Sequence, residues 1–136
     1  MGFSLAVSLD ATHPLQLLLL FAMGHALADY PLQGGFLATF KNRNVKAMPP
    51  GFDRHRDRYL WVHCLTAHAL VHSAMVLLIT GLFWLAVVEL VLHWVIDAMR
   101  CEKHLSFSGD QFLHLGCKVI YMILFWVGVL QLPTPA

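Results

Sequence analysis

The stretch Glu89-Leu-Val-Leu-His93-Trp-Val-Ile-Asp97 places three ionisable side chains four residues apart within an otherwise apolar run. Four residues are close to one turn of an α-helix, so Glu89, His93 and Asp97 share one helix face. At the centre of a bilayer, each acidic group would cost roughly 2.5–3.5 kcal/mol, and such residues usually face the protein interior and serve its function. The stretch therefore predicts a buried polar site inside a helical bundle.

The whole sequence is more apolar than that of a typical soluble protein. Of its 136 residues, 58% are hydrophobic and 12% are charged, whereas roughly a quarter are charged in globular domains. Four apolar segments approach the ~20 residues that a membrane-spanning helix needs; they cover residues 14–30, 60–80, 82–99 and 112–132. The sequence predicts an all-α membrane protein: one domain over residues 1–136, built as a bundle of four transmembrane helices.

The first apolar segment also resembles a signal peptide, because Leu17-Leu-Leu-Leu-Phe21 precedes the small-residue pattern Ala26-Leu-Ala28. Asp10 stands where a signal peptide carries positive charge, so we expect a retained membrane helix.

Basic residues cluster in two of the expected loops. The long loop from Pro31 to Tyr59 carries Lys41, Arg43, Lys46, Arg54, Arg56 and Arg58, and Arg100 and Lys103 follow the third helix. By the positive-inside rule both loops are cytoplasmic, which predicts a multi-pass protein of a bacterial inner membrane with both termini periplasmic. Within the long loop, residues 36–40 predict a short interfacial helix that ends before Pro49-Pro50-Gly51. The lipid bilayer is the expected partner, and the net charge of +1 gives no reason to expect nucleic acid.

Each predicted helix carries a pair of nitrogen or oxygen donors at four-residue spacing. The pairs are His25 and Asp29, His68 and His72, His93 and Asp97, and Asp110 and His114. With His63, they fall in the cytoplasmic half of the bundle or just beyond it, where facing helices commonly build metal sites. Histidine with carboxylate and without thiolate suits zinc first, with iron or manganese as alternatives. The eight paired residues are therefore the predicted metal ligands.

Other interpretations of the same residues stay open. The pairs would also serve as interhelical hydrogen bonds, as a proton or ion pathway, or as haem ligands, although a bis-histidine haem site has no use for so many acids. Cys64, Cys101 and Cys117 have no paired spacing, so neither a disulfide nor a thiolate zinc site is predicted.

Glu89 is the predicted general base. It is the least interfacial of the acids, so it can lie behind the metal ligands and accept a proton from metal-bound water. The alternative is that Glu89 only orients His93.

The order of the motifs resembles that of the DUF3307 family of small bacterial and phage membrane proteins. The similarity rests on His25-Ala-Leu-Ala-Asp29-Tyr-Pro-Leu-Gln33, Lys41, His68-Ala-Leu-Val-His72, His93-Trp-Val-Ile-Asp97-Ala-Met-Arg100 and Asp110-Gln111-Phe-Leu-His114. The resemblance implies a polytopic inner-membrane protein, and the family name assigns no function. Gln33, Lys41, Arg100 and Gln111 fall within these motifs and are predicted to contact the metal ligands or a substrate. Where the family pattern often has a lysine after the acid of the third helix, this chain has Arg100, which keeps a cation there and disfavours a proton-donor role.

Three functions follow from these features. The first is a metal-dependent membrane hydrolase acting on an anionic or lipid substrate. The second is a divalent-cation or proton transporter or channel component, which at this size would need a homo-oligomer. The third is a phage-type membrane interaction protein, whose polar residues would tolerate single histidine substitutions.

Overall fold

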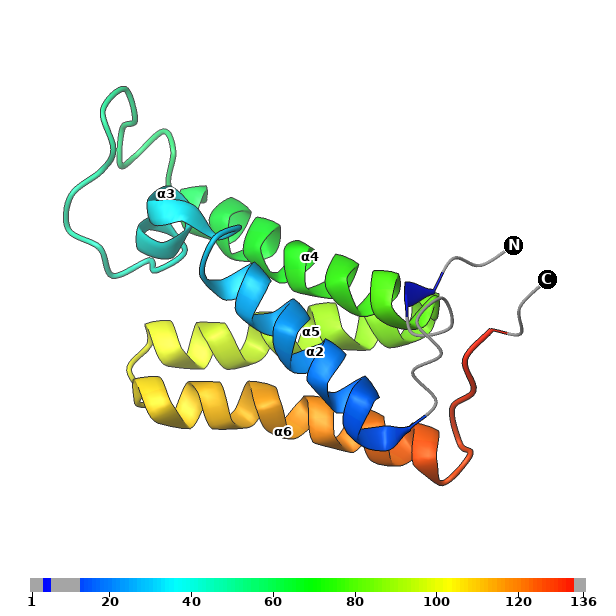
Figure 1. The fold of residues 1–136 in the computed structure, drawn as a ribbon. Helices are drawn as coiled ribbons and strands as arrows, with labels where there is room; N and C mark the ends of the chain where they lie inside the picture. Colours follow the sequence, from blue (N-terminus) through cyan, green and yellow to red (C-terminus); the bar gives the residue numbers. More distant parts are fainter. Residues whose placement is uncertain (1–3, 6–12, 134–136) are drawn as a thin grey trace.

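The computed structural model describes residues 4–5 and 13–133 of the chain. The helices within these residues are α2 (Pro14–Asp29), α3 (Gly34–Phe40), α4 (Leu60–Thr80), α5 (Phe83–Cys101) and α6 (Phe107–Trp126), and the same residues contain no β-strand. The all-α prediction is therefore confirmed for the described part of the chain. Four long helices lie side by side, and α3 with the loop that follows it covers one end of them (Figure 1).

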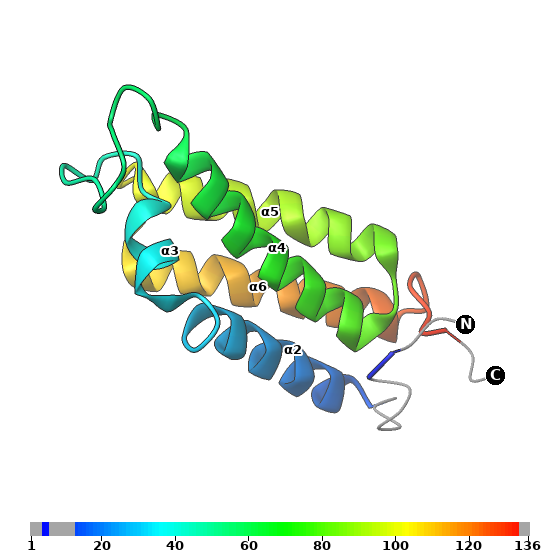
Figure 2. The same ribbon diagram turned by 90° about the horizontal axis from the view of Figure 1, so that it is seen from above.

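A tight turn joins α4 to α5. Gly81 ends α4 in the left-handed conformation, with φ of 71°, and its N–H donates to the Leu77 carbonyl at 2.7 Å. Glycine adopts this conformation without the steric penalty of a side chain. The chain then reverses, so that α5 runs antiparallel to α4 and packs along it (Figure 2).

Helix α6 differs in its bounds from the predicted segment 112–132. It begins at Phe107, because the Ser106 side chain caps the helix by accepting a hydrogen bond from Gly109 N at 3.0 Å. It ends at Trp126, and Gly128 follows in the left-handed region with φ of 77°. The last predicted residues fold back instead of continuing the helix, and Leu132 packs against the apolar core.

The short helix predicted in the long loop is confirmed as α3, which lies at 85° to α2.

Within α2, Gly24 is buried where this helix crosses α4. A Cβ atom at Gly24 would lie 3.0 Å from Ile79 Cδ1, so the absence of a side chain lets the two helices approach closely.

The interior of the bundle has two zones. At the end away from α3, an apolar cluster is built from Leu17, Phe21, Val76, Ile79, Leu85 and Tyr121. At the end near α3, the buried side chains are mostly polar or ionisable. Cys64 and Cys101 are buried free thiols and Cys117 is half-buried, so the described cysteines form no disulfide, as predicted.

One described helix, α4, is long and apolar enough to cross a membrane, and α2 with α3 would add a second if the bent pair were one span. Helix α2 alone has 16 residues, which corresponds to about 24 Å, and α5 carries Glu89, Asp97 and Arg100. One or two candidate spans are weak evidence for membrane association, and the arrangement of four membrane-spanning helices stays a prediction.

Candidate metal centre

All four long helices of the bundle send histidines into its polar zone. His25 comes from α2, His68 and His72 from α4, His93 from α5 and His114 from α6, and each is at most 5% exposed. Their rings contact one another, with ring centroids 3.6 Å apart for His72 and His93 and 4.0 Å apart for His93 and His114. The four-residue spacing of the sequence put these side chains on single helix faces, and the bundle turns those faces toward one centre.

Asp29 gathers one half of this centre. Its Oδ1 atom lies 3.1 Å from His72 Nε2 and 3.4 Å from His68 Nε2. Its Oδ2 atom lies 3.3 Å from His25 Nε2 and accepts a hydrogen bond from Gln111 Nε2 at 2.9 Å. The carboxylate at the end of α2 is thus surrounded by donors from three helices.

Asp97 gathers the other half. Its Oδ2 atom lies 3.2 Å from His68 Nε2 and 3.9 Å from His93 Nε2, and its Oδ1 atom lies 3.5 Å from His114 Nε2. Lys41 Nζ donates to Oδ2 at 2.6 Å. The predicted ligand Asp97 and the predicted contact residue Lys41 therefore meet, although 56 residues separate them in the sequence.

His93 is shared by two groups whose ligand atoms lie within 4.8 Å of one another. The first group is Asp29, His68, His72 and His93, and the second is His93, Asp97 and His114. Imidazole nitrogens with carboxylate oxygens are the donors that zinc, iron and manganese accept. The described residues therefore fit one divalent cation or two.

The hydrogen bonds within the protein leave several of these atoms unsatisfied. In the described part of the chain, Asp110 Oδ1 and His114 Nε2 are buried without a hydrogen bond, although they lie only 3.5 Å apart. Burying polar atoms without partners is costly. A cation bound through His114 would satisfy this nitrogen, and a water or substrate group on that cation would satisfy the Asp110 oxygen, which supports a metal over a purely structural network.

Glu89 lies behind the histidines, on the side of the apolar zone. Its Oε1 atom is 2.5 Å from Lys118 Nζ, and its Oε2 atom accepts a hydrogen bond from Tyr121 at 2.9 Å. Oε1 is also 3.5 Å from His93 Nδ1. A carboxylate beside the second nitrogen of a histidine orients that ring toward a metal. His93 Nδ1 makes no hydrogen bond within the described residues, so both predicted roles of Glu89, as a base and in orienting His93, stay predictions.

A cavity of about 350 Å³ opens beside the centre, between the ends of α2, α5 and α6 and the start of the loop after α3. The carboxylates of Asp29, Asp97 and Asp110 line it, and so do four side chains that the sequence predicted as contacts: Gln33, Lys41, Arg100 and Gln111. Glu89 does not line this cavity. The acids that line this cavity are thus the three aspartates.

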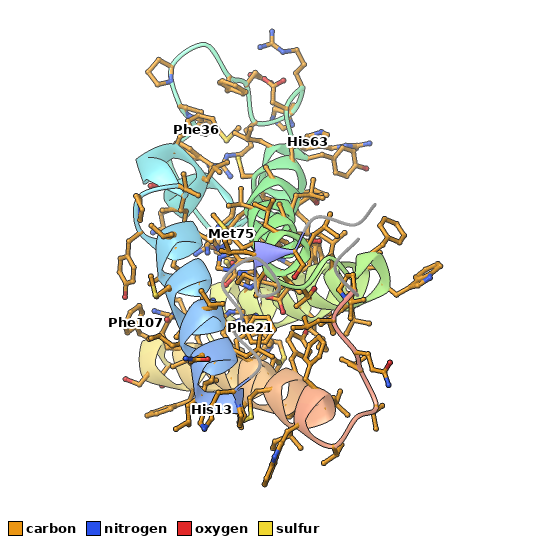
Figure 3. All side chains as sticks on the ribbon, turned by 45° about the vertical axis from the view of Figure 1, so that its right-hand side comes forward. His13, Phe21, Phe36, His63, Met75 and Phe107 are labelled. Carbon is orange, nitrogen blue, oxygen red and sulfur yellow. The ribbon has the colours of Figure 1, made fainter. Side chains whose placement is uncertain are left out.

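His63, which the sequence placed at the same end of the bundle but outside the four predicted pairs, does not join the centre. It is exposed and points away from the bundle interior, whereas Phe21 points into it (Figure 3). His63 precedes His68 by five residues, an offset of about 140° around a helix, so the two cannot share a face.

The segment after α3 is tied to the end of α5 by polar contacts. Arg43 Nε lies 2.5 Å from Glu102 Oε1, and this hydrogen-bonded pair lowers the pKa of the Glu102 carboxyl below its ordinary value. Asn44 donates to the Cys101 carbonyl at 3.2 Å. These contacts hold Lys41 over Asp97. They could not be predicted from the sequence, because charged loop residues have no fixed periodicity.

The comparison with protein families agrees with the motifs that build this centre. The profile of the family described as "Protein of unknown function (DUF3307)" matches residues 17–134. The chain belongs to the DUF3307 family. The match covers helices α3 to α6 in full. It also covers α2 except for the first three residues of that helix, so it includes His25 and Asp29. No curated protein and no solved structure matches the chain.

Proposed function

We propose that this DUF3307 protein is an integral membrane, metal-dependent hydrolase whose centre lies at the cytoplasmic end of the bundle. The observation that carries the proposal is the convergence of histidine Nε2 atoms from four helices on Asp29 and Asp97, directly beside an open polar cavity. A zinc ion fits these donors best, with iron or manganese as alternatives.

The distribution of side chains supports a membrane setting. Most ionisable side chains of the four long helices are buried, and His68 and His93 are 0% exposed, while Leu19, Trp84 and Phe112 on the outer faces are 59%, 76% and 75% exposed. Large apolar side chains are exposed on each of the four long helices. This pattern is the reverse of a soluble protein, and lipid tails would cover such a surface without cost.

The chemistry follows from the donors and the cavity. A divalent ion held here would lower the pKa of bound water to about 7 and supply a nucleophile at neutral pH. Asp110 lines the cavity, lies outside both ligand groups and has an oxygen without a hydrogen bond within the described residues, so it is the best placed acid to accept a proton. Gln111 Nε2 lies 3.3 Å from Asp110 Oδ2 and holds this side chain in place.

Metal analysis of the detergent-purified protein tests the proposal. We expect near-stoichiometric zinc, iron or manganese in the native protein and almost none in a His93→Ala, Asp97→Ala double variant. His63→Ala is the matched control, because this exposed histidine should leave the metal content unchanged. Metal-free native protein, prepared without chelator, would overturn the proposal.

The alternative of an ion or proton pathway has one supporting observation, the continuation of polar groups from Asp97 through His93 and Glu89 to Lys118. This line ends against the apolar cluster at the other end of the bundle. Transport would therefore need a homo-oligomer or another conformation, and a flux assay in liposomes distinguishes it from hydrolysis.

A further inference from the structure

Arg100 is a cation of the cavity, and it has no acidic partner among residues 4–5 and 13–133. Within the described residues, its guanidinium makes one hydrogen bond, from a terminal nitrogen to the Leu105 carbonyl at 3.5 Å. The other cation of the cavity, Lys41, is paired with Asp97, and Arg43 on the outside is paired with Glu102. Most donors of Arg100 are thus free to bind an anion, and a guanidinium matches the geometry of phosphate oxygens.

The charge of the cavity depends on the metal. Three aspartates and two basic side chains line the cavity, so without a metal it carries a net charge of −1. Each divalent cation bound by these aspartates and their histidines adds two positive charges, so the sign of the cavity reverses. An anion is therefore repelled by the metal-free cavity and attracted by the loaded one.

The other residues that line the cavity suit an ester of phosphate. Gln111 is already held by hydrogen bonds to Asp29 and Asp110, so its position is fixed beside the acids. At the rim, Tyr30 and Phe107 are 67% and 58% exposed and present apolar surface next to the polar floor. A volume of about 350 Å³ is within the usual size of small-molecule sites.

We infer that the cavity binds a phosphate group, whose oxygens are held by Arg100 and the bound metal, and that this binding requires the metal. The inference rests on the proposed function and names its substrate class, a phosphate ester. A lipid headgroup and a soluble phosphate share this chemistry, and the exposed rim is open to either source.

Equilibrium dialysis with radiolabelled inorganic phosphate tests the inference on the purified full chain, with the metal content measured in the same samples. Four preparations are compared: the native protein loaded with zinc or manganese, the same protein after chelation, Arg100→Gln, and Arg58→Gln. Arg58 is the matched control, because it is exposed, stacks on the Tyr59 ring and does not line the cavity. We expect phosphate binding only in loaded protein, weaker by about tenfold or more in Arg100→Gln and unchanged in Arg58→Gln.

Competition identifies the source of the phosphate. If the site takes a lipid headgroup, nanodiscs that contain phosphatidylcholine and phosphatidic acid displace the labelled phosphate. If the site takes a soluble phosphate, a soluble phosphomonoester added to nanodiscs of phosphatidylcholine alone displaces it, and the phosphatidic acid nanodiscs do not. Both results support the inference.

Three results would overturn it. They are metal-loaded protein that binds no phosphate, equal binding after chelation, and equal losses in Arg100→Gln and Arg58→Gln. The first of these leaves the proposed metal centre intact, whereas protein that binds no metal at all overturns both the centre and the inference.

Discussion

The Nε2 atoms of His68 and His93 lie 3.2 Å apart, and both side chains are 0% exposed. Two ring nitrogens at this distance share a hydrogen bond only if one carries a proton and the other a lone pair. His68 Nε2 also lies within 3.4 Å of carboxylate oxygens from both Asp29 and Asp97. If both nitrogens present lone pairs instead, they and the two carboxylates converge as ligands for a cation.

The shared position of His93 predicts unequal effects of histidine substitutions on metal content. His93→Ala should remove nearly all bound metal, because this residue belongs to both ligand groups. His114→Ala should leave the metal held by Asp29, His68, His72 and His93, because it belongs to one group only. Elemental analysis after size-exclusion chromatography measures the difference, with circular dichroism as the check on folding. Equal metal contents in the two variants would contradict the shared role of His93.

The buried pair of Glu89 and Lys118 predicts strong coupling between these two residues. Lys118→Met leaves a buried carboxylate without its counterion, and such a loss costs about 3–5 kcal/mol of folding free energy. Adding Glu89→Gln to Lys118→Met should recover most of this loss, because no unpaired charge then remains in the interior. Denaturant unfolding in detergent, arranged as a double-mutant cycle, measures the coupling. Additive effects of the two substitutions would show that the 2.5 Å contact contributes no net stability.

The turn between α4 and α5 predicts a position-specific effect of alanine. Gly81→Ala forces an L-residue into the left-handed region at φ of 71°, which costs roughly 1–2 kcal/mol. Gly116→Ala is the matched control, because this glycine lies inside α6 and a Cβ atom there meets nothing within 4 Å. It should be neutral or stabilising by up to about 1 kcal/mol. Thermal unfolding of the two variants distinguishes them, and equal midpoints would argue against the left-handed cap.

The placement of basic residues predicts the topology of the chain in the membrane. An alkaline phosphatase reporter inserted after Gly51 should be inactive, because the loop is expected in the cytoplasm. The same reporter fused after Leu132 should be active in the periplasm. Carbonate extraction of the unfused protein checks that it stays in the membrane fraction. Active reporters at both positions would rule out the predicted orientation, and release by carbonate would rule out an integral membrane protein.

The local features of the fold were readable from the sequence. Four-residue spacing fixed which donors share a helix face, as for His93 and Asp97 on α5, because the period of a helix is a local property. The bounds of α6 were less readable, since a Ser106 cap and a fold back after Trp126 both depend on short contacts that apolar segments do not encode.

The arrangement of the site was decided by the tertiary structure. Periodicity gives the angular position of a residue on its own helix, but the rotation of each helix against its neighbours follows from the packing of all of them. That packing turned Glu89 toward Lys118 and away from the cavity, and it placed Lys41, from a loop, on Asp97. The sequence by itself determined that this protein has helices with polar faces and which donors those faces carry. Only the folded bundle determined that the faces meet at one centre, beside a cavity that Arg100 and three aspartates line.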